Sequence, residues 1–420
     1  MHPLENSTVE RGSVKVISGR SKWAIAVHIV AIILATTMFI YIIYSLAPLY
    51  RNLIKEREWV AILYLTLACL IIPPYWSSVT YRTLLLLILP FSSKLKCQTF
   101  KVLDSKFLMP VSIVIAIRNE PASIVIPLLK SLLKLDYPDY EIVITDNSDI
   151  LDDRNKINRD FLDIFEFAKT HKTRNFRFVR RDCGARSYEF PELSRMLHPR
   201  LKDARVKGNL IGGKAGNLNA ALNSANERYK WFLILDSDSL LPDRTLCQMV
   251  SIALQVERTH QSVGFIQGVL SSANPNESSL SNTLSVIDEI YYDNYSRLKS
   301  TFGVVSNWGH GVLVSRKAWE ATGGFPCEIS EDLAWANEVL LLGKFENHHA
   351  LCHTFETKPV TWKALKIQRN RWAKGTTIQM RKQLFPLWKS DKLLWYEKMD
   401  LTYDMTRYIF TSIGCLLPFF

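Results

Sequence analysis

Two aspartates, Asp236 and Asp238, follow directly after a short apolar segment, residues 231–235. This segment predicts a buried strand, because it is too short for a helix and polar residues follow it at once. In an open α/β sheet, ligands bind beyond the carboxyl ends of the strands. Two carboxylates at that edge repel each other unless a cation lies nearby, and oxygen ligands suit Mg²⁺ or Mn²⁺. Taken alone, the pair fits a solvated turn equally well.

A glycine-rich segment upstream has the composition of an anion-binding loop. Gly212 and Gly213 precede Lys214 and a helical run that extends to residue 222, and the N-terminus of a helix attracts anions. The segment is not a Walker loop, because the pattern GxxxxGK[ST] is absent. Lys214 is thus a candidate for binding a diphosphate, although this loop by itself favours an ordinary solvated lysine.

Two downstream segments carry polar groups whose local role is open. Ser330 and Asp332 stand before a predicted helix, where such residues commonly serve as N-terminal caps. Gln368 and Arg371 are three residues apart and share a helix face, with Trp372 beside them. An amphipathic surface helix explains the second pattern equally well. The local sequence therefore leaves two alternatives to a functional site: a helix cap at Ser330 and Asp332, and a surface helix at Gln368 and Arg371.

The histidine and cysteine pattern does not favour a metal or disulfide framework. Seven cysteines are scattered without a CxxC pair, as expected of a reduced, cytosol-facing protein. Residues 348–353 contain three histidines and Cys352. They alternate like a strand and lack zinc-type spacing, so a metal site is disfavoured there.

The elements that would position the candidate residues follow an α/β pattern from residue 111 onward. Buried strands are predicted over residues 111–117, 141–145, 174–181, 231–235 and 263–270, and helices over 124–135, 244–257 and 363–380. The first strand, helix and second strand form a right-handed βαβ unit whose strand ends face ligands. No role is assigned to residues 182–210.

Charge and hydropathy indicate a membrane protein and exclude a nucleic-acid partner. The chain has 420 residues and a net charge of +12, but no nucleic-acid motif accompanies the charge. Residues 23–47 are apolar with His28 as the one ionisable group, which predicts a membrane-spanning helix. A second span is predicted from residue 59 to about 76, with an interfacial piece to residue 91, because Pro73 and Pro74 interrupt it.

The expected arrangement is multi-pass in the cell membrane, with the main domain on the cytoplasmic side. Residues 1–22 form a cytoplasmic tail, two spans follow, and a further membrane region begins within residues 400–420. Four lysines between residues 94 and 106 follow the second apolar segment, and such basic clusters favour the cytoplasmic face. A basic loop between the two spans weakens this orientation.

The candidate residues, taken in order, resemble the motifs of the family-two glycosyltransferases, and more closely those of the membrane-embedded, cellulose-synthase-like branch. The matching residues are Arg118-Asn119-Glu120, Asp146, Gly213-Lys214-Ala215-Gly216-Asn217, Asp236 and Asp238, Glu331-Asp332, and Gln368, Arg371 and Trp372. Each motif is weak alone, whereas their occurrence together in this order is specific. The resemblance covers about residues 108–390.

The resemblance implies a GT-A domain, a Rossmann-like α/β sheet, over residues 108–345, followed by an acceptor-side and interfacial region over 346–395. It also implies a role for each matching residue. Glu120 and Asp146 would contact the nucleoside, Lys214 would contact the diphosphate, and Asp236 and Asp238 would bind a Mg²⁺ or Mn²⁺ ion. Asp332 would be the general base, and Arg371 would neutralise the leaving diphosphate. Gln368 and Trp372 would shape the acceptor end.

The expected reaction is transfer of a sugar from a nucleotide-diphosphate donor, UDP-glucose or similar, to a growing β-glycan. A metal and an arginine suit the charge that develops on the leaving diphosphate. One base without an enzyme nucleophile implies a single displacement with inversion. Two alternatives stay open: a non-processive transferase that adds one sugar to a membrane lipid, and a non-catalytic glycan-synthase subunit. The resemblance also leaves room for a membrane or periplasmic partner subunit.

Two features depart from cellulose synthases. The segment Trp308-Gly309-His310 replaces their Phe-Phe-Cys-Gly-Ser-like motif and looks more like bacterial periplasmic β-glucan glucosyltransferases, which argues against cellulose as the product. Processive relatives have several helices after the Gln-x-x-Arg-Trp motif, whereas about one apolar segment follows Trp372 here. We therefore expect either a truncated chain or a protein that does not translocate polymer unaided.

Overall fold

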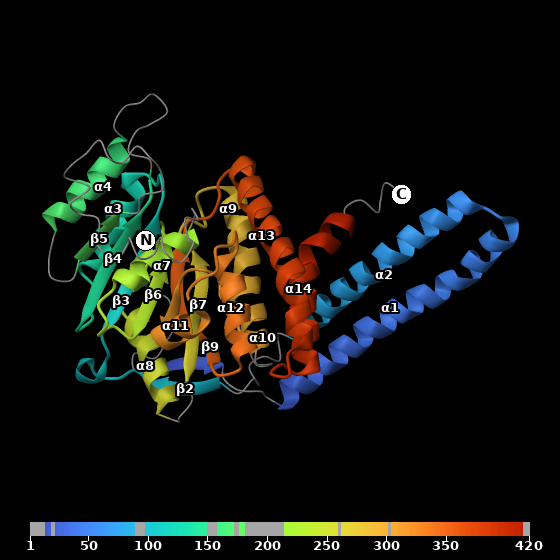
Figure 1. Cartoon of the computed structure of the whole chain (residues 1–420), viewed down its shortest axis with the longest axis horizontal. Coiled ribbons are helices and arrows are strands. Elements are labelled where there is room, and N and C mark those ends of the chain that lie inside the picture. The colour runs from blue at the N-terminus through green and yellow to red at the C-terminus, as the bar shows by residue number, and fades with distance from the viewer. Residues whose placement is uncertain are drawn as a thin grey trace.

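The computed structural model of the chain describes residues 13–17, 22–88, 97–148, 158–171, 176–180, 214–258, 262–300 and 304–414. Residues 182–210, the Gly212-Gly213 pair, the end of the interfacial piece at 89–91 and residues 415–420 lie outside the described residues. Figure 1 shows an α/β domain from which a long two-helix hairpin projects.

The described strands form one mixed sheet in the order β2-β1-β9-β7-β8-β6-β3-β4-β5. Their bounds are β1 Ser13–Ile17, β2 Cys97–Lys101, β3 Val111–Ile117, β4 Tyr140–Asp146, β5 Phe176–Arg180, β6 Trp231–Leu235, β7 Val263–Ser272, β8 Val312–Ser315 and β9 Glu346–Glu356. Strands β6, β3, β4 and β5 are parallel neighbours, so their carboxyl ends meet at one edge. The predicted α/β class and the apolar strands are confirmed.

Helices cover both faces of the sheet because its central strands are apolar on both sides. In β3, Ile113 and Ile115 belong to the core formed with α3, α4 and α8, whereas Val114 belongs to the core formed with α7, α11 and α12. Alternate residues of a strand point to opposite faces. The bounds of these helices are α3 Ala122–Leu132, α4 Arg159–Thr170, α7 Lys214–Ser224, α8 Thr245–Glu257, α11 Arg316–Thr322 and α12 Glu331–Leu342.

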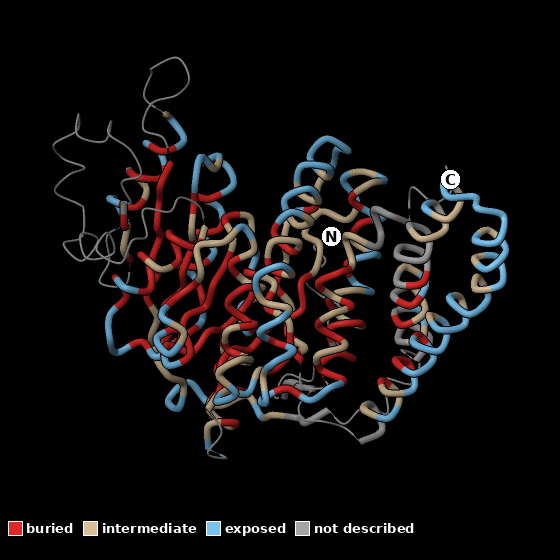
Figure 2. The backbone as a smooth tube through the Cα atoms, turned by 45° about the vertical axis from the view of Figure 1, so that its right-hand side comes forward, coloured by how far each residue is buried: buried red, intermediate tan, exposed pale blue. Residues whose placement is uncertain are grey.

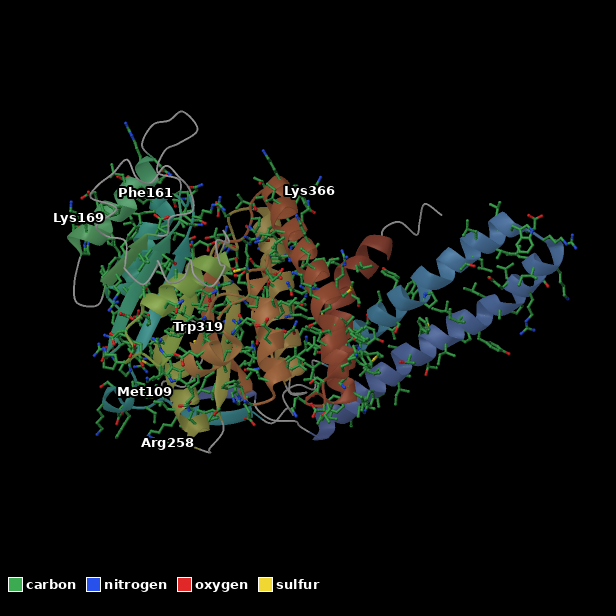
Figure 3. All side chains as sticks on the ribbon, viewed as in Figure 1. Met109, Phe161, Lys169, Arg258, Trp319 and Lys366 are labelled. Carbon is green, nitrogen blue, oxygen red and sulfur yellow. The ribbon has the colours of Figure 1, made fainter. Side chains whose placement is uncertain are left out.

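Aromatic side chains fill the core that lies beneath the candidate site. Trp319 of α11, labelled in Figure 3, packs edge-on against Phe232 with ring centroids 6.2 Å apart. Trp335 of α12 is fully buried between Phe265 and Phe325. These contacts fix α11 and α12 on the sheet, and with them the start of α12, where Glu331 and Asp332 stand.

The remaining helices form a second group beside the sheet. They are α9 Ser279–Asp288, the π-helix η5 Glu289–Tyr295, α10 Ser296–Ser300, α13 Trp362–Lys389 and α14 Trp395–Gly414. Helix α13 packs on α12 and on α14, and α14 contacts both helices of the hairpin. Figure 1 shows this group between the sheet and the hairpin. Lys366 marks the outer end of α13 in Figure 3.

The hairpin consists of α1 (Lys22–Glu56) and α2 (Trp59–Ile88). Within the described residues, one helical segment, Ile25–Glu56, is long and apolar enough to cross a membrane, and most of it is exposed (Figure 2). The helix predicted from residue 59 to about 76 is longer in the structure, because α2 continues past Pro73 and Pro74 to Ile88. A proline removes one helical hydrogen bond, and packing along α1 and α14 holds the helix together.

The sheet extends beyond the predicted domain boundaries on both sides. Strand β9, after the boundary predicted at residue 345, pairs in parallel with β7. Strand β1 lies within the segment predicted as a free tail, yet it pairs with β2 and β9. These pairings join segments that are far apart in sequence, so local patterns carry no signal for them. The chain therefore enters the hairpin from the sheet and returns to the same sheet.

Candidate active site

One cavity of about 810 Å³ collects nearly all of the predicted site residues. It lies beyond the carboxyl ends of β3 and β6 and is closed on the other side by α12 and α13. The predicted residues that line it are Glu120, Lys214, Asp236, Asp238, Asp332, Gln368, Arg371 and Trp372. They come from several separate parts of the chain, so the fold brings together residues that are widely spaced in the sequence.

Asp146 is the predicted site residue that does not line the cavity formed by the described residues. It is fully buried at the end of β4, where its Oδ1 accepts a hydrogen bond of 2.6 Å from the Ser148 amide. The adjacent Asn147 lines the cavity, and its side-chain oxygen accepts a 2.8 Å hydrogen bond from Asn217 of α7. Asp146 therefore shapes the turn that presents Asn147, a residue that the sequence did not single out.

Lys214 occupies the centre of the site at the first position of α7. Its ammonium lies 2.5 Å from Asp236 Oδ1, donates a 2.8 Å hydrogen bond to the Gly309 carbonyl, and is 3.9 Å from Glu331 Oε1. Burial alone would lower the pKa of Lys214, but Asp236 and Glu331 outweigh it and raise that pKa. Burial likewise opposes ionisation of Asp236, while Lys214 and His310 keep its pKa below the usual range. Both groups are charged at neutral pH.

Asp238 lies among carboxylates and forms no ion pair with any described residue. Burial raises the pKa of Asp238, and the charges of Asp236 and Glu356 raise it further. Burial, Asp238 and Asp236 raise the pKa of Glu120 in the same way. Such mutual repulsion is relieved when a cation binds between the groups. The donor set of two Asp carboxylates fits Mg²⁺ or Mn²⁺, which usually take few protein ligands and complete their shell with phosphate and water.

The described residues contain no cluster of three or more His, Cys, Asp or Glu side chains arranged around a common metal position. A site built on Asp236 and Asp238 would therefore need ligands from a substrate. The histidines of β9 do not supply a metal site. His348 is buried, and burial lowers its pKa to about 4, so it is a neutral core side chain.

Asp332 and Glu331 begin α12 and face the cavity. The Leu333 amide donates a 2.7 Å hydrogen bond to Asp332 Oδ1, whereas the Ser330 side chain caps no amide among the described residues. Burial raises the pKa of Asp332 above its ordinary value. Burial also raises the pKa of Glu331 to about 7, against the opposing effect of Lys214. Asp332 is thus a better proton acceptor than an exposed aspartate would be.

The loop opposite Asp332 approaches it so closely that a glycine is required. Gly309 has φ +81°, and a Cβ there would lie 2.9 Å from Asp332 Oδ2. Gly311 has φ +58°, and its Cβ would lie 2.3 Å from Thr354 Oγ1. The loop between them is therefore pressed against both α12 and β9, and the Gly309 carbonyl is held by Lys214.

A buried charge network holds this loop, and the sequence did not predict it. His310 Nε2 lies 2.6 Å from Glu356 Oε2, Glu356 also pairs with Lys358, and Lys358 Nζ lies 2.5 Å from Asp288 Oδ2. Glu356 keeps the pKa of His310 raised although burial alone would lower it. The four residues come from three separate parts of the chain, which explains why spacing gave no signal. Glu356 and His310 both line the cavity.

Helix α13 carries the last three site residues to the far wall. A Cβ at Gly375 would lie 2.0 Å from Ser330 Oγ, so the glycine lets α13 pack tightly against the start of α12. One turn earlier on α13, Gln368, Arg371 and Trp372 line the cavity. Asp332 lines the same cavity.

Comparisons with known proteins agree with this geometry. Residues 231–420 match the sequence model of the family described as Glycosyl transferase family group 2. Glucans biosynthesis glucosyltransferase H of Caulobacter vibrioides is 25% identical over 227 residues, which are 50% of this chain and 32% of that protein. The chain thus spans about a third of the length of this curated relative.

Among solved structures, mannosyltransferase PcManGT from Pyrobaculum calidifontis, in complex with GDP-Man and Mn²⁺, has a similar fold. The two superpose with a TM-score of 0.53 at 18% sequence identity, over 82% of this chain and 85% of that one. The family match begins at the first residue of β6. The chain is thus similar to the glycosyltransferases of family group 2 over residues 231–420, and its α/β fold resembles that of the solved mannosyltransferase.

Proposed function

We propose that the protein is an inverting glycosyltransferase that transfers a sugar from a nucleotide-diphosphate donor, UDP-glucose or similar, to a growing β-glycan at the cytoplasmic face of the membrane. The observation that carries this proposal is the cavity in which Lys214, Asp238, Asp332 and Arg371 meet. Transfer of a sugar from a diphosphate to a hydroxyl needs positively charged groups beside the diphosphate and a proton acceptor beside the hydroxyl. The cavity contains both.

The diphosphate end is formed by Lys214 and Arg371. Lys214 stands at the N-terminus of α7, where backbone amides favour an anion, and it stays charged because Asp236 and Glu331 flank it. Arg371 is exposed in the cavity wall and offers planar donors that match phosphate oxygens. Asp236 and Asp238 would hold Mg²⁺ or Mn²⁺, which when bound neutralises the charge of the diphosphate.

Asp332 would accept the proton of the acceptor hydroxyl. A proton acceptor is most useful when its pKa lies near the working pH, and burial raises the pKa of Asp332 towards that range. Gly309 and the Leu333 amide fix the carboxylate in one position. Because a single displacement inverts the anomeric carbon, an α-linked donor would give a β-linked product. Glu120 and Asn147 would line the nucleoside end, and Gln368 and Trp372 the acceptor end.

The sheet topology supports the proposed membrane arrangement. Strand β1 precedes the hairpin and β2 follows it, and the two strands pair with each other. A hairpin that leaves from one sheet and returns to it crosses a bilayer an even number of times if it crosses at all. Nucleotide sugars are made in the cytoplasm, so the domain would lie on that side. The expected partners are the donor, a glycan or lipid acceptor and the membrane.

The test is incorporation of label from a panel of nucleotide sugars by membranes that contain the full-length protein. The panel includes UDP-glucose and also GDP-mannose, because the structural relative is seen with GDP-Man. We expect UDP-glucose to give a ladder of alkali-stable, β-linked products on a sizing gel. A single glycolipid would instead identify the non-processive lipid transferase. No transfer from any donor, with UDP still bound, would indicate a non-catalytic subunit.

A further inference from the structure

A buried polar network connects the hairpin to α10 and α14. Tyr81 of α2 donates a 2.7 Å hydrogen bond to Asp400 Oδ1, and its hydroxyl lies 3.0 Å from His28 Nδ1 of α1. The other oxygen of Asp400 lies 3.2 Å from the ammonium of Lys299, which also pairs with Asp404. His28, Tyr81 and Asp400 have no exposed surface. The network therefore joins the hairpin to the main domain by charge as well as by apolar packing.

The inner end of this network belongs to the wall of the cavity. Lys299 and Asp404 both line it, and Asp404 is the more exposed of the two, at 15%. Tyr295, the last residue of the π-helix η5, donates a 3.3 Å hydrogen bond to Asp404 Oδ1. The cavity wall and the hairpin are thus linked through three consecutive polar contacts, from Tyr81 to Asp400, to Lys299 and to Asp404.

The same wall carries a group of aromatic side chains. Tyr291 and Tyr292 of η5 pack against Trp308, with ring centroids 5.3 and 5.1 Å apart. Trp308 and Tyr292 line the cavity. A π-helix is rare and is often found at functional sites. The π-helix η5 is followed directly by α10, and Tyr295 of η5 and Lys299 of α10 both contact Asp404.

Stability alone is a weak reason for such a network. Ionised groups lose hydration when they are buried, and an apolar replacement of a buried ion pair is often no less stable. Lys299 is 1% exposed and Asp400 is fully buried. The polar side chains fix the geometry of the network more strictly than apolar side chains would, because each hydrogen bond has a direction and a partner.

We propose that Tyr81 is a positioning residue for the acceptor side of the site: through Asp400 it holds Lys299 and Asp404, and therefore the wall formed by η5 and Trp308. The hairpin would then be part of the acceptor-binding apparatus as well as an anchor. This inference rests on the proposed function where it concerns an acceptor, and on the contacts alone where it concerns the position of η5.

The test compares Tyr81→Phe with Ser77→Ala in the full-length protein. Ser77 is a matched control, because its hydroxyl lies 2.8 Å from the Tyr403 hydroxyl and joins the same two helices, α2 and α14. With UDP-glucose as donor and a β-linked glucose tetrasaccharide as acceptor probe, Tyr81→Phe should raise the acceptor KM by about three- to tenfold, the effect of one buried hydrogen bond. UDP affinity should stay unchanged, and Ser77→Ala should change neither quantity.

A third variant, Asp404→Asn, tests whether the contacts act as one unit. If Tyr81 works through Asp404, the double variant should raise the acceptor KM no more than the larger single variant, because coupled residues are not additive. Independent effects would multiply and would overturn the proposal. Equal acceptor KM values for Tyr81→Phe and Ser77→Ala would overturn it as well, since they would reduce Tyr81 to an ordinary packing residue.

Amide hydrogen exchange decides the same question without any substrate. Residues 289–300 should exchange faster in Tyr81→Phe than in Ser77→Ala, because the end of η5 has lost its support. Equal exchange in the two variants would overturn the proposal. If the wild-type protein transfers no glucose to the tetrasaccharide, the proposed donor and acceptor are wrong, and the exchange comparison still decides whether Tyr81 positions η5.

Discussion

Lys214 Nζ lies 2.5 Å from Asp236 Oδ1, and this ion pair joins the N-terminus of α7 to the carboxyl end of β6. Lys214→Met should weaken UDP binding by about ten- to hundredfold, because a hydrogen bond to a charged group is lost and Asp236 loses its counter-charge. Calorimetric titration with UDP measures this, and Lys344→Met, at an exposed lysine near the end of α12, is the control. Unchanged affinity in Lys214→Met would remove this lysine from the diphosphate site.

Alanine substitutions at Gly309 and Gly323 separate the effect of backbone strain from the effect of a side chain that contacts Asp332. Their φ angles are +81° and +80°. A Cβ at Gly309 would lie 2.9 Å from Asp332 Oδ2, whereas a Cβ at Gly323 would meet no atom of the described residues within 4 Å. Each substitution by Ala should lower the free energy of unfolding by about 1 kcal/mol. Gly309→Ala alone should also reduce the transfer rate, by at least about tenfold, because Asp332 must move. Equal rates in the two variants would show that Asp332 does not need its observed position.

The pH dependence of transfer should report on the pair formed by Glu331 and Asp332. Asp332 accepts a proton only as a carboxylate, and burial raises its pKa, so the rate should fall on the acid side at a higher pH than an exposed aspartate would produce. Glu331, whose pKa is about 7, adjoins Asp332, and the charge of each carboxylate raises the pKa of the other. Glu331→Gln should therefore move the acid limb of kcat/KM to lower pH.

Glu338 is the matched control for this shift. Burial raises its pKa to about 7 as well, but it lies further along α12 and does not line the cavity formed by the described residues. Glu338→Gln should leave the acid limb in place. A limb that moves equally in both variants, or that is absent above pH 5, would contradict the assignment of the limb to Asp332.

Asp238 should be required for activity because it completes the metal site. Asp238→Asn is expected to reduce transfer by roughly 10²–10³-fold, the cost of losing one group that stabilises developing charge. EDTA should inhibit the wild-type protein, and Mg²⁺ or Mn²⁺ should restore it. Asp243→Asn, at an exposed position in the same loop, should keep normal activity. Full turnover in EDTA with no residual metal would contradict the metal assignment.

The sequence predicted the parallel centre of the fold well, for a physical reason. Strands β3, β4 and β6 are buried on both faces, so they stand out as largely apolar runs. The polar residues after them must lie at one edge of the sheet. This pattern is enough to place Glu120, Asp236 and Asp238 near one another. The order of motifs then added Asp332 and Arg371, whose local patterns alone fit a helix cap and a surface helix.

Features that depend on distant pairing were not predictable. Strand β1 is only five residues long, and its pairing with β9 joins segments near opposite ends of the chain. The network from His310 to Asp288 and the one from Tyr81 to Asp404 each need several elements to be packed before their members meet. Asp146 follows a strand as Glu120 does, but the turn at Ser148 directs it into the protein, and a local pattern does not encode that direction.

The most direct test of the central claim is the transfer rate of Asp332→Asn measured beside its affinity for UDP. The asparagine keeps the shape of the side chain and can still accept the 2.7 Å hydrogen bond from the Leu333 amide, but it is not a base. We predict that transfer falls by about 10²–10⁴-fold, the usual contribution of a general base, while UDP affinity changes less than about twofold. Near-normal transfer by Asp332→Asn would contradict the account, because the base would then lie elsewhere.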